Sequence, residues 1–440
     1  MKKVILLTLL LGNLCEAVDT PATSAKNEEK LLNELVSDAL KANGMDCPIS
    51  FRGTLNFSLL GVSQNKRGDN ACRLFALESD IFVKNLNKCD QYDFGFEVGA
   101  KANSGIIKQG GAIIRTAYLF LTSDATGTVK LGYTPTMADS LTINGGSVLV
   151  GYGGYGSRNL SLFYNESAGS FVDDGFPFDD SKAAKIAYLS REFSGLSLGL
   201  SFTPDSRTKN PFQTIHPKVG NRQVSDEKAN CPGMRTAYSK NIVTGGIVYK
   251  FGDPKAFNGK LALCGWLGKG KTTLADVEVN DIRAYNLGVI FGYKDFKLAL
   301  GYSNNCESLR SKRYASADIT VFDVTRGYTL ADANVGLKPG ADAGQTFSVG
   351  AAYAINDRLT VSAGYFRSEV KFSMDEKATA DVTSLAFEYV PHKSCSVYLE
   401  YNNVQSDSCP RAQAYHKACK LSTTGKNRGN MLILGLKLSI

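Results

Sequence analysis

The sequence contains no internal run of about 20 apolar residues, so it encodes no membrane-spanning helix. Histidine is scarce: the chain has three, and His216, His392 and His416 all fall in segments that we expect to be loops or turns. No Ser-His-Asp order and no paired carboxylate site emerges, so the sequence does not indicate an enzyme, and we expect no cofactor. Lysine and arginine are scattered despite a formal net charge of +8, which argues against a nucleic-acid partner.

What the sequence does contain is a regular alternation of apolar with polar or small residues. Along residues 347–365, large apolar side chains alternate with small or polar ones on both sides of a tight polar turn at 356–358, which is typical of a β-hairpin. One face of this hairpin is apolar, and the other has almost nothing with which to fill a core. A sheet closed into a barrel, with lipid outside and water inside, accommodates that pattern.

The same alternation recurs along residues 49–440 and predicts an all-β fold, a transmembrane antiparallel β-barrel of sixteen strands. An even number of strands closes the sheet and leaves no edge, as a bilayer requires. The predicted connections alternate in length. They are short at 123–126, 192–195, 294–295, 356–358 and 391–393, and long at 135–183, 204–240, 304–344 and 405–428. We therefore expect the short turns to face the periplasm and the long loops to face outward.

The N-terminal residues differ from the rest of the chain. A basic start at Lys2 and Lys3, an apolar stretch at 4–11 and a small residue at Ala17 predict a signal peptide over residues 1–17. Residues 18–48 predict a periplasmic amphipathic helix and linker, with leucines along one stripe. This helix would pack on the end of the barrel or form a coiled-coil stem between subunits. The segment holds too few heptads for a stem to be stable alone.

Export to an oxidising compartment favours disulfides over metal sites. The chain has ten cysteines, and removal of Cys15 with the signal peptide leaves an odd number, so at least one thiol is free or pairs with another chain. Cys409, His416 and Cys419 share one predicted loop, which would allow a metal site. A disulfide between Cys409 and Cys419 is the favoured interpretation, and we predict no metal.

Strand parity places many charged residues on the polar face of the predicted barrel. The basic ones are Arg52, Arg115, Lys130, Lys185, Lys250, Lys260, Lys297 and Lys437, and the acidic ones are Glu78, Asp80, Asp93, Glu97, Glu388 and Glu400. The simpler interpretation is that they are hydrated wall residues. The functional one is that a subset lines a constriction and sets ion preference, with Arg52, Arg115, Lys130 and Lys185 as candidates. The candidate for the narrowing element is the connection 135–183, because it is long and rich in aromatic residues that favour packing.

Two stretches resemble general Gram-negative porins. GTVKLGYTP at 127–135 resembles the start of their pore-loop region, and KIAYLSREFSG at 185–195, followed by LSLGLSFTP, resembles their sixth and seventh strands. The resemblance covers roughly residues 49–440. It implies a barrel in the outer membrane of a Gram-negative bacterium, surrounded by lipid and lipopolysaccharide, usually a homotrimer, with the third loop at 135–183 folded inward. It also implies that Asp173, Asp174, Asp179 and Asp180 on this loop face Arg52, Arg115 and Lys130 on the wall.

The function expected from this resemblance is passive diffusion of small hydrophilic solutes and ions. Two alternatives remain open. One is a structural or adhesive surface barrel, linked by cysteines and plugged by its loops. The other is a substrate-specific channel, which would differ only in lumen detail. Conductance in planar bilayers separates the pore from the structural barrel.

Overall fold

The structure is a computed structural model that describes residues 49–64, 74–89, 91–104, 111–153, 183–206, 237–253, 256–272, 279–308, 344–371, 377–407 and 426–439. The predicted signal peptide at 1–17 and the predicted helix and linker at 18–48 lie outside the described residues. So do the acidic residues of the third connection, Asp173, Asp174, Asp179 and Asp180, and the predicted pair Cys409 and Cys419.

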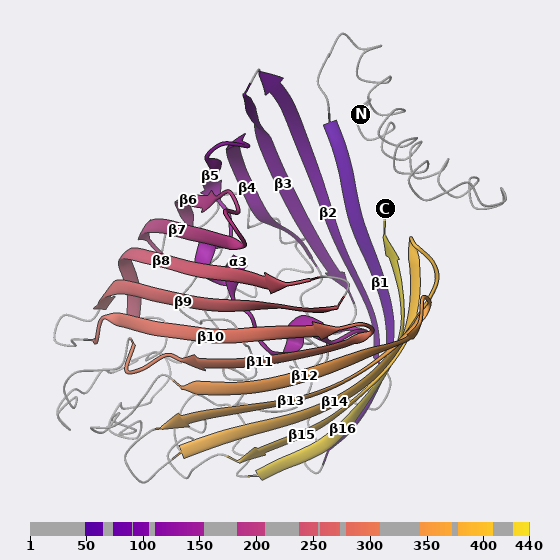
Figure 1. The fold of residues 1–440 in the computed structure, drawn as a ribbon. Coiled ribbons are helices and arrows are strands. Elements are labelled where there is room, and N and C mark those ends of the chain that lie inside the picture. The colour runs from indigo at the N-terminus through magenta and orange to yellow at the C-terminus, as the bar shows by residue number, and fades with distance from the viewer. Residues whose placement is uncertain are drawn as a thin grey trace, which may run out of the picture.

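Sixteen strands make up the described fold (Figure 1). They are β1 (Ile49–Gln64), β2 (Leu74–Cys89), β3 (Tyr92–Ser104), β4 (Gly111–Ser123), β5 (Gly127–Tyr133), β6 (Ala184–Ser190), β7 (Leu196–Asp205), β8 (Ala237–Gly252), β9 (Phe257–Thr272), β10 (Ile282–Tyr293), β11 (Phe296–Asn304), β12 (Gln345–Asn356), β13 (Leu359–Lys371), β14 (Lys377–His392), β15 (Cys395–Asp407) and β16 (Lys426–Ser439). Two short helical turns follow β5: α3 (Met137–Leu141) and the 3-10 turn η2 (Gly145–Val148). No helix in the described part of the chain is long and apolar enough to cross a membrane.

Every strand pairs with its sequence neighbours in antiparallel register, and β1 also pairs with β16, so the sheet closes on itself. At the closure, Thr54 lies opposite Ser439 and Gln64 opposite Gly429. Closure pairs the backbone groups that an open edge would expose, and this is a condition for crossing a bilayer. The predicted sixteen-stranded antiparallel barrel is therefore confirmed.

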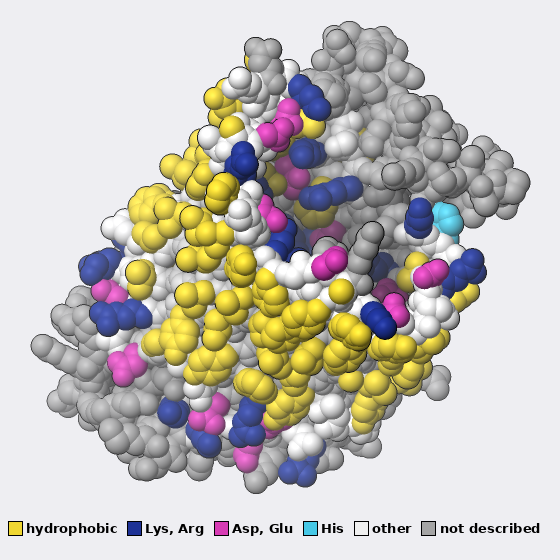
Figure 2. Space-filling view, in the orientation of Figure 1, with side chains coloured by type: hydrophobic (Ala, Val, Ile, Leu, Met, Phe, Trp, Pro, Cys, Tyr) yellow, Lys and Arg dark blue, Asp and Glu magenta, His cyan; other side chains and the backbone are white. Residues whose placement is uncertain are grey.

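The outward face of the barrel is apolar. On β12, Phe347 and Tyr353 are exposed on this face, whereas Ser348 between them in sequence is buried on the other. Figure 2 shows the resulting band of apolar side chains, flanked at both ends by charged ones. Such a band, with aromatic residues near its margins, matches the hydrocarbon layer of a membrane in a barrel protein.

Short turns and long connections lie at opposite ends of the barrel, as the sequence predicted. The turn between β12 and β13 is closed by the Asn356 side chain, whose Oδ1 accepts hydrogen bonds from the backbone N–H groups of Arg358 and Leu359, each at 2.9 Å. Lys294 adopts a positive φ of 52° in the tight turn between β10 and β11. These features of the turns are local, and turn geometry of this kind sets the register of a hairpin independently of residues far away in the sequence.

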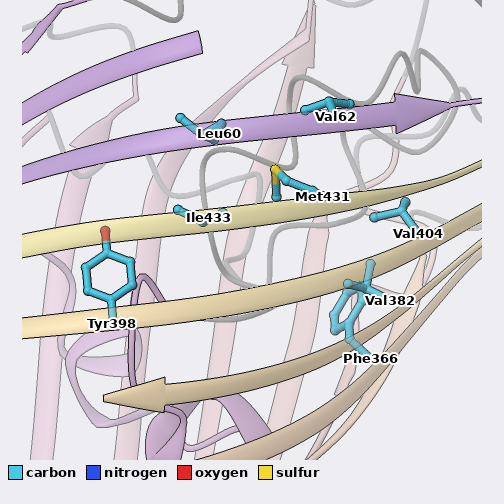
Figure 3. Close-up of a cluster of buried hydrophobic side chains, with 8 residues drawn as sticks. All are labelled: Leu60, Val62, Phe366, Val382, Tyr398, Val404, Met431 and Ile433. Carbon is cyan, nitrogen blue, oxygen red and sulfur yellow. The ribbon is translucent and has the colours of Figure 1, made fainter. Parts of the chain in front are cut away.

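The inward face divides into two parts. From β8 to β16 it carries apolar clusters, one of which contains Trp266, Ile242 and Ile282. A second cluster, drawn in Figure 3, joins side chains of β1 and β13–β16: Leu60, Val62, Phe366, Val382, Tyr398, Val404, Met431 and Ile433. From β1 to β5 the inward face carries charged and aromatic side chains. The candidate site lies on the charged part, on β1–β5.

Candidate functional site

The charged part of the inward face, which we call the charged wall, lies on β1–β5. Its basic side chains outnumber its acidic ones. The basic members are Arg52, Lys84, Lys101 and Lys130, and the acidic members are Glu78, Asp80 and Glu97. Each occupies a position that alternates with the outward-facing apolar residues of its strand, such as Leu59, Ile81 and Phe96. The period-two pattern of the strand is therefore what directs these charges inward.

Glu97 sits at the centre of the charged wall. Its Oε1 accepts hydrogen bonds from Arg52 Nη2 at 3.3 Å and from the Tyr118 hydroxyl at 2.9 Å. The Glu97 side chain is only 10% exposed, whereas that of Arg52 is 62% exposed. The guanidinium is therefore presented to the lumen, while the carboxylate that orients it is largely covered.

Three of the cations stand over aromatic rings that also face inward. Arg52 Cζ lies 4.6 Å from the ring centroid of Phe82, Lys84 Nζ lies 4.9 Å from that of Phe120, and Lys130 Nζ lies 4.9 Å from that of Tyr118. A cation over a ring face gains roughly 0.5–2 kcal/mol, more when it is shielded from water. The rings thus hold long side chains in place and keep their charge facing the lumen.

Lys101 is held differently from the other basic groups. Its Nζ lies 3.0 Å from Glu78 Oε2 and 3.6 Å from Asp80 Oδ2. All three side chains are largely covered, and one cation beside two carboxylates leaves this group with one negative charge in excess. The positive charge that the charged wall presents to a solute comes from Arg52, Lys84 and Lys130.

The connection after β5 covers the other part of the inward face. Thr136 is the N-cap residue of its helix α3, and the Thr136 hydroxyl accepts a hydrogen bond from Asp139 N at 3.1 Å. Met137 N donates to Ser201 Oγ on β7 at 3.0 Å. Ala138 and Leu141 pack against the cluster that contains Trp266. Figure 1 shows α3 within the ring of strands.

Beyond α3 the connection continues along the inward face to β15. Gly145 N donates to Ser348 Oγ on β12 at 3.0 Å, and Val150 N donates to Ser362 Oγ on β13 at 3.0 Å. Tyr152 N then donates to Glu400 Oε2 on β15 at 2.8 Å. Leu149 and Tyr152 pack against the cluster of Figure 3. Backbone donors of the connection are thus paired with two serine hydroxyls and one carboxylate on the inward face of β12, β13 and β15.

This contact corrects one expectation from the sequence. The small inward face of the β12 hairpin is not left to water alone, because the η2 segment lies on it. A Cβ on Gly350 would come within 2.0 Å of Gly145 O, and one on Gly288 within 2.1 Å of Ile143 O. The residues of this face are small because the backbone of another segment approaches them closely.

The structure brings together some of the predicted site residues. Arg52 and Lys130 belong to the charged wall with Glu97. Arg115 does not join them: it is the extra residue of a β-bulge, because Gly99 pairs with Thr116 and Ala100 pairs with Ile114. Arg115 is exposed, and among the described residues no ion pair or hydrogen bond links it to the charged wall.

The expected parity of β4 was wrong. Strict alternation from the polar-face position expected of Arg115 would turn Tyr118 and Phe120 toward lipid, but the Tyr118 hydroxyl bonds to Glu97 and Phe120 is buried. Leu119 and Leu121 are the exposed residues. An apolar residue does not mark the outward face where an aromatic ring packs against an inward-facing cation. Here the ring of Phe120 lies under Lys84 and that of Tyr118 lies under Lys130.

Lys185 is also placed differently from the expectation that it lines the constriction. Its side chain faces inward but only 2% of the residue is exposed. Nζ donates to Thr134 O at 2.7 Å and to Ala183 O at 3.0 Å. These carbonyls stand at the two ends of the connection 135–183, so Lys185 ties those ends together instead of presenting charge to the lumen.

Sequence reasoning had missed the roles of Lys84 and of the rings of Phe82, Phe120 and Tyr118. Lys84 alternates with Ile81 and Val83, so parity alone could have placed it on the wall. The rings of Phe120 and Tyr118 gave no such signal, because an aromatic residue on a barrel strand ordinarily indicates the lipid face, whereas Phe82 shares the parity of Lys84. No cluster of side chains that could hold a metal ion occurs in the described part of the chain.

Comparison with known families fits this architecture. A family model described as Gram-negative porin matches residues 42–408. The chain belongs to the Gram-negative porin family. The porin is therefore a protein of the outer membrane, as the resemblance implied, and its family and fold indicate a channel and not an enzyme.

Its sequence relatives include uncharacterised proteins of Rickettsia. One from Rickettsia conorii is 23% identical over 362 residues, which cover 71% of the porin and 73% of that protein. One from Rickettsia bellii is 26% identical over 235 residues, which cover 43% of the porin and 53% of that protein. The porin thus spans about half the length of the Rickettsia bellii protein.

Solved structures with a similar fold are outer-membrane proteins. A loop L8 deletion mutant of OmpT from Vibrio cholerae matches with a TM-score of 0.53 at 12% identity, over 90% of the porin and 99% of that chain. The outer membrane channel DcaP of Acinetobacter baumannii matches with a TM-score of 0.51 at 13% identity, over 90% and 97%. An anion-selective porin from Comamonas acidovorans has a TM-score of 0.50 at 13% identity, over 90% and 100%. At these identities the similarity shows the fold alone.

Proposed function

We propose that this porin is a passive diffusion channel for small hydrophilic solutes and ions, and that solutes pass along the charged wall of β1–β5. The observation that supports this is the division of the inward face. The described part of the third connection lies on the apolar and small residues of β7–β15, while the exposed guanidinium of Arg52 and the amines of Lys84 and Lys130 remain on the other part.

We propose that the constriction forms where the rest of the third connection, within 135–183, meets the charged wall. Its carboxylates, Asp173, Asp174, Asp179 and Asp180, would then stand across the lumen from Arg52 and Lys130. Opposite charges at a narrow point bias the passage of ions. Because the basic wall and the acidic loop act in opposite directions, we expect weak selectivity that is sensitive to single charges.

Recordings in planar bilayers test this function. The purified porin is expected to give large, stable conductance steps; a structural or adhesive barrel would give none. A conductance that saturates with one solute would favour the substrate-specific channel instead. Deleting residues 169–180 is expected to raise the conductance. If the deletion leaves the conductance at the parent value, the connection is not the narrowing element.

The role of the wall is tested by the reversal potential in asymmetric salt. Arg52→Glu and Lys130→Glu are each expected to shift it toward cations, because each removes a positive charge from the lumen and adds a negative one. Arg115→Glu makes the same change of charge outside the charged wall and serves as the control. Equal shifts for all three variants would show that the wall has no special effect on selectivity.

We also propose that the porin assembles as a homotrimer. This proposal is supported by family membership and by a structure of similar fold, OmpT of Vibrio cholerae, which is described as a trimer form (TM-score 0.51, 13% identity). Native mass spectrometry of the detergent-extracted protein tests it. A monomer over the whole range of detergent and protein concentrations would contradict it.

A further inference from the structure

A group of lysines that does not belong to the charged wall lies on the inward face of β8–β11. We call it the β8–β11 lysine cluster, and it consists of Lys250, Lys260 and Lys297. Lys250 and Lys260 share the inward parity of Val248 and Ala262, which belong to a buried apolar cluster. Lys297 shares that of Ala299, which is fully buried. All three lysines are themselves exposed, so they project into the lumen.

The lysine cluster lies at the end of the barrel that carries the short turns. Lys250 stands two residues before the end of β8 at Gly252, and Lys297 is the second residue of β11. The strand order puts β8–β11 across the closed ring from β1–β3 (Figure 1). Ile143 of the third connection packs on Val248, one inward-facing row nearer the middle of the barrel. The cluster is therefore separate from the charged wall and faces the short-turn mouth.

The register of β8 and β9 brings two of these charges together. Lys250 lies directly opposite Lys260, and like charges in such a pair destabilise a sheet. Glu192 Oε2 pairs with Lys250 Nζ, whereas Lys260 and Lys297 form no ion pair with any described residue. Three ammonium groups beside one carboxylate leave two positive charges in excess. An anion bound between the lysines would relieve this repulsion.

A notch in the wall lies next to the unpaired lysines. Asn258 on β9 and Lys297 on β11 both lie opposite Gly292 on β10, which has no side chain to fill the space between them. A Cβ on Gly292 would lie 2.8 Å from Asn258 Oδ1 and 3.3 Å from Asn258 Nδ2, so the amide lies over the glycine. Lys260 is one inward-facing row further along β9, about 7 Å from Asn258. An amide and two ammonium groups thus surround one hollow.

We propose that the β8–β11 lysine cluster binds small anions that carry two or more negative charges, such as pyrophosphate. Lys260 and Lys297 come from strands that are about 10 Å apart. An anion with two charged groups can contact both amines from the hollow between them, whereas an anion with one charged group contacts one. Each ammonium group held about 4 Å from a charge contributes about fivefold in affinity in water. The proposal rests on the proposed function, because the site is reached through the lumen.

The test compares two variants of the full-length protein with the same change of charge at the same end of the barrel. The site variant carries Lys260→Gln and Lys297→Gln. The control carries Lys294→Gln and Lys393→Gln, both in short turns; Lys294 Nζ lies 5.3 Å from the ring centroid of Tyr293, which is exposed on the outward face. Titration of pyrophosphate followed by ³¹P NMR in detergent measures the affinity. We expect the site variant to bind at least about tenfold more weakly than the parent, and the control to bind within about twofold of it.

Further arms test the charge of the ligand and the location of the site. Succinate, with two charges, is expected to compete with pyrophosphate, whereas acetate, with one, is not. Arg52→Gln with Lys130→Gln is expected to keep the binding that depends on Lys260. Equal competition by the two carboxylates, equal loss of affinity in site variant and control, or binding that depends only on Arg52 and Lys130 would overturn the proposal.

The denaturation temperature protects the test from folding defects. Lys260→Gln removes a like-charge pair, so the site variant is expected to be at least as stable as the parent when no anion is present. Pyrophosphate is expected to raise the denaturation temperature of the parent and of Lys260→Arg with Lys297→Arg, but not that of the site variant. An equal rise in parent and site variant would overturn the proposal.

Binding in detergent and conductance in bilayers separate this proposal from the proposed function. A protein that binds pyrophosphate through Lys260 and Lys297 but forms no pore would overturn the proposed channel and leave the site in place. A protein that conducts, but whose affinity for pyrophosphate is the same in parent and site variant, would overturn the site and leave the channel.

Discussion

The contact between the third connection and the inward face of β12 can be tested with one methyl group. Gly350 faces inward, and a Cβ there would lie 2.0 Å from Gly145 O and 2.8 Å from Gly145 C. Contacts of a Cβ with backbone atoms below 3.0 Å are essentially never observed. In Gly350→Ala the backbone at Gly145 must therefore move by about 1 Å, which strains its hydrogen bond to Ser348 Oγ.

The expected loss of stability combines the clash at Gly145 with the weakened hydrogen bond to Ser348. Overpacking costs about 1–3 kcal/mol, and a net hydrogen bond contributes about 0.5–1.5 kcal/mol. Together they predict a destabilisation of roughly 2–4 kcal/mol. Because the wall blocks movement outward, the connection can move only toward the lumen. We therefore expect a lower single-channel conductance with more frequent closures, and a lower denaturation temperature of the barrel in detergent.

Gly61→Ala is the matched control. Gly61 lies on β1, faces outward, and has no atom within 4 Å of an added Cβ. The same chemical change there is expected to leave conductance and denaturation temperature at parent values. If Gly350→Ala behaves like Gly61→Ala in both measurements, η2 does not rest on β12 as described, and the narrowing of the lumen must be explained in another way.

Four further predictions concern anchors, topology and redox state. Glu400→Ala removes the acceptor of Tyr152 N and Asn402 Nδ2 and is expected to cost roughly 2–4 kcal/mol and to increase channel noise; noise at the parent level would contradict the anchor. Lys185→Met leaves the carbonyls that close the third connection without their donor and is expected to lower the denaturation midpoint, whereas Lys185→Arg should lower it less. A cysteine at Asp357 should react with an impermeant maleimide only after the outer membrane is permeabilised; labelling of intact cells would reverse the proposed topology. Cys409 and Cys419 should be recovered as a disulfide by mass spectrometry without reduction, which stabilises their loop by roughly 2–3 kcal/mol in the chain-entropy model; two free thiols would contradict the pairing.

Much of the fold could be predicted from the sequence because its signals are local. Alternation in the segment around Phe347 sets which residues face lipid, and the Asn356 turn sets the hairpin register within a few residues. Repeated along the chain, these patterns determine the strand number and the alternation of short and long connections. Closure then follows physically, since a bilayer does not tolerate an open edge.

Only the tertiary structure decided which inward residues carry charge into the lumen. Arg52, Lys130 and Lys185 have the same inward parity, but Lys185 is buried between two carbonyls while Arg52 is exposed beside Glu97. The bulge that removes Arg115 from this group depends on how β3 pairs with β4. These outcomes depend on contacts between segments far apart in the chain, such as Gly145 with Ser348. Period-two alternation specifies a face of the sheet, but it cannot specify what lies against that face.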